Sequence, residues 1–177
     1  GDKAPLDRYP SNSLLFDGEH FDAFKIKVDN ELYNKNYSRL RYIVNNFPGL
    51  ISKICADMMF GEPPRITLPE GENHDNNSDW LESWIHDVDF FTTMYEASMT
   101  ASYKGDAVFK LRVGELHDPS NMSIIVEQVQ PDYYFPKIDP MNVNGDPKEI
   151  EISFIINIGE DEYLRKEIHT AGKIRNE

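Results

Sequence analysis

The hydrophobic period of the chain changes at Gly105-Asp106-Ala107-Val108-Phe109-Lys110-Leu111-Arg112-Val113. Before this stretch, apolar residues recur at the three- and four-residue steps of a helix, and from Ala107 onwards they alternate with polar residues, as in a strand. One face of the predicted strand would carry Ala107, Phe109, Leu111 and Val113. The stretch therefore predicts helices before residue 105 and strands after it.

One long helix is predicted directly before this stretch, over about residues 79–104. Asp79 could cap it, with Glu82 reaching back in a capping-box arrangement. Gly105 would close the helix before the first strand. The apolar residues of this segment share one face, which we expect to be buried: Leu81, Trp84, Ile85, Val88, Phe91, Tyr95 and Met99.

A second helix is predicted to begin at Asn46-Phe47-Pro48, because proline suits the first turn of a helix. Gly61 fits the left-handed position after its last turn, and Pro63-Pro64 prevent continuation. Its expected buried stripe is Leu50, Ile51, Ile54, Cys55, Met58 and Met59. A shorter helix is predicted over residues 37–46, and a turn at Asp17-Gly18.

Alternating patterns continue after residue 113. They predict strands around residues 124–129 and 149–158, a turn at 159–162, a strand through Leu164 and Ile168, and a hairpin turn at 170–173. Helices followed by an antiparallel meander indicate an α+β fold. We divide the chain into a weakly patterned N-terminal segment, 1–36, and an α+β domain, 37–177. Because a strand has barely begun when the sequence stops at Glu177, we expect a truncated chain.

The composition is that of a folded, acidic protein. The 177 residues are 40% hydrophobic, and 18 Lys and Arg against 31 Asp and Glu give a net charge of −13. This charge argues against a basic nucleic-acid clamp and against binding to anionic lipid. No apolar run approaches the roughly 20 residues that span a bilayer, and the first residues lack the apolar core of a signal peptide. We expect a protein of the cytoplasm or of an assembly, without membrane contact.

Three histidines are each followed by aspartate, as His74-Asp75, His86-Asp87 and His117-Asp118. Such pairs can bind divalent metals when other ligands converge, so a metal-dependent phosphohydrolase is one alternative function. That class of enzyme uses an all-helical bundle, whereas these pairs fall in a loop, on a helix and in a turn. We interpret them as solvated side chains and expect no metal and no other cofactor.

The remaining candidates for chemistry have simpler interpretations. Glu149 and Glu151, on one strand face, are interpreted as a solvated edge rather than an acid/base pair. Cys55 is expected in the core, and no phosphate-binding or nucleophile motif is present. The aromatic run from Tyr133 to Pro136 could instead contact a protein, which leaves a generic α+β adaptor as another alternative. We expect no enzymatic activity.

Four segments resemble the N-terminal half of tailed-bacteriophage portal proteins. They are residues 15–20 (Leu-Phe-Asp-Gly-Glu-His), 43–64, 102–108 (Ser-Tyr-Lys-Gly-Asp-Ala-Val) and 127–136. Phe-Gly-Glu-Pro at 60–63 and Tyr-Lys-Gly-Asp-Ala at 103–107 are the most specific parts. The motif positions to which we assign structural roles are Phe47, Pro48, Phe60, Gly61, Glu62, Pro63, Gly105, Asp106, Pro131, Phe135 and Pro136.

The resemblance implies a structural protein. Portal proteins form a ring, usually of twelve subunits, through which DNA enters and leaves the capsid without sequence-specific binding. Their partners are terminase, capsid and head-tail adaptor proteins, and they occur in the virion and in the cytoplasm of the infected or lysogenic host. The matched part would be the peripheral wing. We expect these 177 residues alone to be monomeric or weakly oligomeric.

Overall fold

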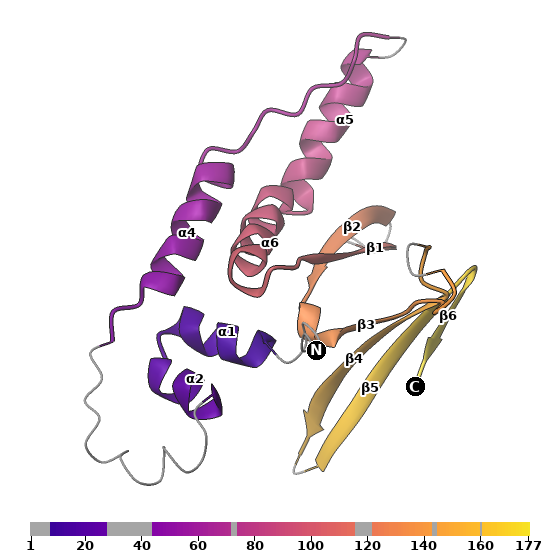
Figure 1. Cartoon of the computed structure of the whole chain (residues 1–177). Helices are drawn as coiled ribbons and strands as arrows, with labels where there is room; N and C mark the ends of the chain where they lie inside the picture. Colours follow the sequence, from indigo (N-terminus) through magenta and orange to yellow (C-terminus); the bar gives the residue numbers. More distant parts are fainter. Residues whose placement is uncertain (1–7, 28–43, 72–73, 116–121, 143–144, 160) are drawn as a thin grey trace, which may run out of the picture. The chain divides into compact units, whose positions relative to one another are not determined.

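The computed structural model describes residues 8–27, 44–71, 74–115, 122–142, 145–159 and 161–177. It divides into two compact units, Gly1–Gln128 and Val129–Glu177. The first unit carries the helices and a two-stranded sheet, and the second a four-stranded antiparallel sheet (Figure 1). The α+β class, with helices first and a meander second, is confirmed. The boundary predicted between residues 36 and 37 falls outside the described ranges.

The first unit contains α1 (Tyr9–Asp17), α2 (His20–Lys27), α4 (Phe47–Phe60), α5 (His74–Asp87) and α6 (Phe90–Lys104). Strands β1 (Val108–Glu115) and β2 (Met122–Val129) pair as a two-stranded sheet. Helix α4 packs along α6, and α1 contacts both of them. The predicted turn at Asp17-Gly18 is confirmed, because Gly18 is left-handed (φ 83°) and separates α1 from α2.

The prediction of one continuous helix over residues 79–104 was wrong, because this segment belongs to two helices, α5 and α6. Helix α5 begins at His74, so Asp79 lies inside it and does not cap it. Asp89 then adopts a left-handed conformation (φ 53°) and separates α5 from α6. Aspartate tolerates this conformation better than most residues, which explains how one position can break the helix. Gly105 closes α6 in a left-handed conformation (φ 91°), as predicted.

Helix α4 has the predicted start but buries a different face. Its fully buried residues are the small Gly49, Ser52 and Ala56, which lie against α6 and α1. The predicted apolar stripe is exposed instead: Leu50, Ile51, Ile54, Cys55, Met58 and Met59. Small residues let two helices approach closely, because the distance between axes depends on the side chains at the contact. The predicted stripe and the core position of Cys55 were therefore wrong.

The two ends of α4 also differ from expectation. Gly61 is right-handed (φ −63°, ψ −36°) and donates to Asp57 O at 2.8 Å, so it continues the helical path instead of reversing it. Pro63 and Pro64 then keep the chain out of the helix. The helix predicted over 37–46 falls mostly outside the described residues, and its last three residues, 44–46, are not helical.

The second unit is the predicted meander. After a 3-10 turn, η3 (Pro131–Tyr133), the strands follow as β3 (Tyr134–Lys137), β4 (Glu149–Ile158), β5 (Asp161–Thr170) and β6 (Lys173–Asn176). Each strand pairs antiparallel with the next. Left-handed glycines form the two predicted hairpin turns, Gly159 at φ 67° and Gly172 at φ 74°. Ile152 and Ile168, whose side chains point to opposite sheet faces, are its two buried apolar strand residues among those described.

Candidate functional site: the junction of α1, α4 and α6

Asn46 connects two segments that are distant in sequence. Its side-chain Nδ2 donates to Phe16 O at 2.9 Å, at the end of α1, and its Oδ1 accepts from Gly49 N at 3.0 Å, in the first turn of α4. Asparagine is a preferred N-cap because its side chain satisfies a backbone N–H that has no partner within the helix. Asn46 therefore caps α4 and fixes it to α1 with the same amide group.

Gly49 permits the closest approach at this place. A Cβ added to it would lie 2.5 Å from Phe16 O and 2.7 Å from Asn46 Nδ2. Real Cβ atoms are not found so near a backbone oxygen, so this position accepts only glycine without a shift of α1 or α4. The contact explains why Gly49 is buried although it belongs to the exposed start of a helix.

The end of α6 completes the arrangement. The Phe16 and Tyr103 rings stack with centroids 4.3 Å apart and planes 20° from parallel. The buried Tyr9 donates its hydroxyl hydrogen to the carboxylate of Asp106, just beyond α6. We call this group the junction and define it as Tyr9, Phe16, Gly18, Asn46, Gly49, Tyr103 and Asp106. It lies entirely within the first unit.

Replacing Asn46 with Ala should lower the free energy of unfolding of the first unit by about 1–2 kcal/mol, because one N-cap bond and one bond to α1 are lost together. Both tryptophans of the chain, Trp80 and Trp84, lie on α5 in this unit. Urea unfolding followed by tryptophan fluorescence therefore measures it selectively. Asn46→Asp is the matched variant: it keeps the acceptor for Gly49 N, loses the donor to Phe16 O, and should be affected less. Equal stability of wild type and Asn46→Ala would contradict this role.

The structure separates the predicted motif positions into three places. Phe47, Pro48, Gly105 and Asp106 lie at or beside the junction. Phe60, Gly61, Glu62 and Pro63 lie at the far end of α4, about 20 Å away for a helix of this length. Pro131, Phe135 and Pro136 belong to the second unit, where Pro131 is buried, Phe135 is half-buried and Pro136 is exposed.

Sequence reasoning missed the residues that make the contacts in the junction. Phe16, Asn46, Gly49 and Tyr103 all fall inside the segments that carry the portal resemblance; Asn46 was placed at a helix start, but no contact was predicted for any of the four. Asn46 carried a usable signal, because asparagine followed by proline two residues later is typical of a helix start. The stacking of Phe16 on Tyr103 had no local signal, because it joins residues from opposite ends of the unit.

Helices α4 and α6 are also joined near the other end of α4. Tyr95 donates its hydroxyl hydrogen to Asp57 Oδ1 at 2.8 Å, and Ser98 Oγ lies 3.3 Å from Met59 Sδ. The hydrogen bond to the Asp57 carboxylate favours the protonated phenol and raises the pKa of Tyr95. These contacts hold the two helices along their length, so the junction is the end of a continuous packed pair.

The two His-Asp pairs within the described residues do not converge. His74 and His86 lie on the same helix, twelve residues apart, which corresponds to about 18 Å along its axis. His117 and Asp118 lie outside the described residues. Within the described ranges, no group of three or more His, Cys, Asp or Glu side chains is placed to hold a metal ion. The described pairs thus provide no geometry for metal-assisted hydrolysis.

A hollow of about 280 Å³ lies in the first unit between α5 and the strands β1 and β2. Trp84 closes part of it by donating its Nε1–H to Ile124 O at 2.7 Å, and the ring of Trp80 stacks on that of Trp84. Asp87 is the one ionisable side chain in its lining.

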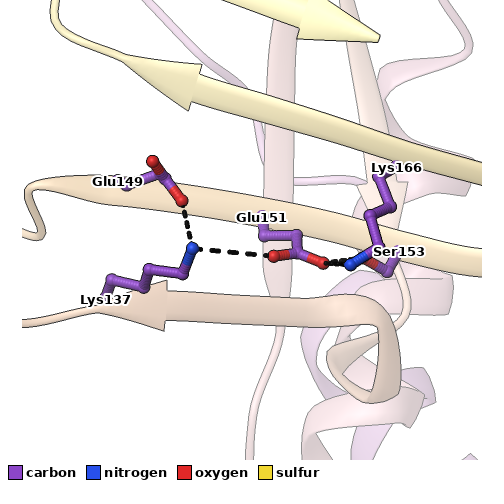
Figure 2. A network of polar contacts seen from close by, with 5 residues as sticks. All are labelled: Lys137, Glu149, Glu151, Ser153 and Lys166. Carbon is purple, nitrogen blue, oxygen red and sulfur yellow. Dashed lines mark hydrogen bonds and ion pairs between the residues drawn. The ribbon is translucent and has the colours of Figure 1, made fainter. Parts of the chain in front are cut away.

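In the second unit, charged side chains alternate across one face of the sheet (Figure 2). Lys137 on β3 pairs with Glu149 on β4, and its Nζ lies 3.8 Å from Glu151 Oε2. Lys166 on β5 approaches Glu151 Oε1 to 2.8 Å, and Ser153 Oγ donates to the same oxygen at 2.6 Å. The carboxylates of Glu149 and Glu151 are half-buried and paired, so their interpretation as a solvated edge was wrong.

The network sets the ionisation of its members. Hydrogen bonds from Lys166 and Ser153 stabilise the carboxylate form and lower the pKa of Glu151 below its ordinary value of 4.5. The hydrogen bond to Glu149 raises the pKa of Lys137. A carboxylate with two ammonium partners and a hydroxyl donor is a poor proton acceptor at neutral pH, so this network tethers three strands and provides no general base.

Replacing Glu151 with Gln should destabilise the second unit by about 1 kcal/mol at pH 7, because Lys166 loses its carboxylate partner. Since the pKa of Glu151 is lowered on folding, its contribution is complete above pH 4.5 and is lost as the pH falls through the folded-state value. The difference between wild type and variant should therefore stay constant from pH 7 down to about pH 4.5 and shrink as the pH falls further. Hydrogen exchange of amides in β4 and β5 measures it, with the exposed Glu162→Gln as control. A difference independent of pH would contradict the prediction.

The aromatic run at 133–136 is partly covered within its own unit. Tyr133 is 42% exposed, its ring centroid lies 5.9 Å from that of Phe154, and Tyr134 and Phe135 are half-buried. The adaptor hypothesis required these rings to be available to a partner. Only Tyr133 is exposed enough to contribute substantially.

This chain matches none of the protein-family models against which it was searched, and no curated protein matches it. Over the described ranges, no helix is both long enough and apolar enough to cross a bilayer.

Proposed function

We propose that this chain is a structural subunit of a viral portal ring, the DNA conduit at one vertex of a tailed-phage capsid. The observation that carries the proposal is the junction, because three of the four segments that resemble portal proteins meet there. Residues 15–20, 43–64 and 102–108 supply Phe16, Asn46, Gly49, Tyr103 and Asp106. Phe16, Asn46, Gly49 and Tyr103 contact one another, and Asp106 accepts a hydrogen bond from Tyr9, which suits a role in shape.

Two further features support a subunit of an assembly. Large apolar side chains are exposed along α4 and along β1, where Phe109, Leu111 and Val113 share one strand face. Exposed apolar surface of this kind is typical of proteins that contact other proteins. The net charge of −13 also suits a conduit, since each basic group on a DNA path would add affinity for phosphate through counterion release.

In this proposal the protein acts without catalysis and without a cofactor. Its full-length form assembles as a ring, with twelve subunits as the expected number, and contacts terminase, capsid and head-tail adaptor proteins. DNA passes through the ring without sequence-specific binding. The protein would occur in the virion and in the cytoplasm of the infected or lysogenic bacterial host.

The test is electron microscopy of the complete gene product that contains these 177 residues. We expect closed rings with a central channel, and light scattering of the same preparation should give the mass of about twelve subunits. The 177-residue chain by itself should remain monomeric or weakly associated. Monomers alone in the complete product, at protein concentrations at which phage assemblies form, would overturn the proposal.

A further inference from the structure

The hairpin of β4 and β5 extends beyond its neighbouring strands (Figure 1). Strand β3 pairs only with residues 149–152 of β4. Strand β6 pairs with residues 167–170 of β5, and one further backbone pair joins Lys166 to Glu177. Within the described part of the chain, residues 153–158 of β4 and 161–165 of β5 therefore pair only with each other. We call residues 153–158 the free edge of β4.

Unpaired strands expose backbone N–H and C=O groups, and proteins usually protect them with charged residues, proline or bulges. The outer part of β5 has such protection in Asp161, Glu162 and Arg165. The free edge of β4 reads Ser-Phe-Ile-Ile-Asn-Ile, without a charge, a proline or a glycine. Ile155 is 64% exposed and Ile158 is 61% exposed. Short uncharged segments of high β-propensity pair readily with copies of themselves.

We propose that the free edge of β4 pairs antiparallel with the same edge of a second copy of this chain. A two-fold axis perpendicular to the sheet relates the copies, and such an axis keeps the faces of the two sheets aligned. Ile156 then lies opposite the partner's Ile156, and Phe154 opposite the partner's Ile158. All three side chains point to one face of the joined sheet.

The position of β3 leaves room for this register. Its pairing ends at Tyr134, opposite Ile152, where the chain turns into η3. The Tyr133 ring lies against Phe154 and marks the inner limit of the free edge. An incoming strand centred on Ile156 covers residues 154–158, and the partner's Gly159 then lies opposite Ser153, directly next to the end of β3. If the partner strand were shifted by two residues toward β3, its Ile158 would lie opposite Ile152. That position is already paired with Tyr134 of β3.

Charge identifies the second copy as the occupant. Two chains of net charge −13 repel one another over most of their surface. Pairing along this edge brings no charged side chain of one copy opposite a charge of the other, because residues 153–158 contain none. A charged partner strand would meet no charged side chain among residues 153–158, whereas an identical uncharged strand matches these residues in hydrogen bonding and hydrophobicity.

The pairing is weak and independent of the proposed portal function. A single edge of five or six residues buries much less than the roughly 1,200 Å² of a stable interface, so we expect a dissociation constant of about 0.1 mM. Neighbours in a cyclic ring meet through different surfaces, whereas this contact joins identical surfaces. The contact therefore belongs to subunits outside a ring, and it is present or absent whether or not the complete protein forms rings.

Sedimentation equilibrium of the 177-residue chain tests the proposal. Wild type should show a monomer–dimer equilibrium, and the exposed double substitution Ile155→Lys and Ile158→Lys should raise the dissociation constant at least tenfold. The matched control is Leu164→Lys on β5, which is 55% exposed and lies opposite Ile155 on the same sheet face. It should change the constant less than twofold. A monomeric wild type at 0.5 mM, or equal weakening by Leu164→Lys, would overturn edge pairing.

A second measurement does not depend on the folding of the lysine variant. In a Cys55→Ser background, Ile156→Cys places two thiols opposite each other across the proposed axis. A short thiol-to-thiol cross-linker should then yield a covalent dimer at least tenfold faster than with Leu164→Cys. Circular dichroism of both variants should match wild type. Equal cross-linking of the two cysteine variants would reject the register.

Discussion

Gly49→Ala is expected to lower the free energy of unfolding of the first unit by about 2–3 kcal/mol. The added Cβ would lie 2.5 Å from Phe16 O and 2.9 Å from Asn46 Oδ1. Because Phe16 O is a backbone atom, α1 must move away from α4, and the Asn46 side chain, which contacts the same Cβ, must shift as well. The stack of Phe16 on Tyr103 moves with α1, so the substitution disturbs the whole junction.

Helix propensity alone would predict the opposite effect, a stabilisation by Gly49→Ala. In an exposed helix interior, alanine is more favourable than glycine by about 1 kcal/mol. A net loss therefore requires that the close approach to α1 cost more than this gain. Tryptophan fluorescence during urea unfolding measures the difference, because Trp80 and Trp84 both lie in the first unit.

Gly71 offers the matched control for Gly49. Its φ is not positive, and a Cβ added there meets no atom within 4 Å. Gly71→Ala should change the free energy of unfolding by less than about 0.5 kcal/mol. If Gly49→Ala were as stable as Gly71→Ala, the contact between α1 and the start of α4 would not hold in solution.

Ala56→Leu should cost about 2–3 kcal/mol in the first unit, whereas Met58→Ala should cost less than about 0.5 kcal/mol. Ala56 has no exposed surface and lies on the buried face of α4, which packs against α6, so three extra carbon atoms must push the helices apart. Met58 is 84% exposed and loses little contact when it is shortened. The same fluorescence measurement serves for both variants.

These two variants distinguish the observed packing of α4 from the packing that its sequence suggests. If the apolar stripe with Met58 faced the core, Met58→Ala would cost 2–5 kcal/mol and Ala56→Leu would be nearly neutral. The observed orientation predicts the opposite order. Measuring the larger cost for Met58→Ala would therefore contradict the placement of α4 on α6.

Sequence patterns predicted the elements of this protein better than their packing. The change of period at residue 105, the start of α4 at Asn46-Phe47-Pro48 and the meander hairpins all follow from local periodicity and turn residues. The break at Asp89 could not be predicted in this way, because one residue in a left-handed conformation leaves the helical spacing of apolar residues intact on both sides. The buried face of α4 could not be predicted either, because hydrophobic periodicity assigns the large apolar residues to the core, whereas α4 buries small ones.

The candidate site was predictable only in part. Three of the four segments that carry the portal resemblance contain every junction residue except Tyr9, but the junction contacts join residues 30 and 87 positions apart, as in Asn46 to Phe16 and Phe16 to Tyr103. No period within one segment encodes such contacts. In the charge network, the sequence placed Glu149 and Glu151 on one strand face, but the pairing register of β3, β4 and β5 decided which lysines meet them.

The small-residue face of α4 has a consequence for how relatives of this protein would differ from it. Position 49 should remain glycine, and positions 52 and 56, which are also buried, should vary only among glycine, alanine and serine. The side chains at positions 51, 54 and 58 are exposed, and these positions should accept many residue types, limited only by any partner protein that binds this face of α4. As sequences diverge, the large exposed apolar residues of α4 should therefore change first. The spacing of the small buried residues at positions 49, 52 and 56 should be retained longest.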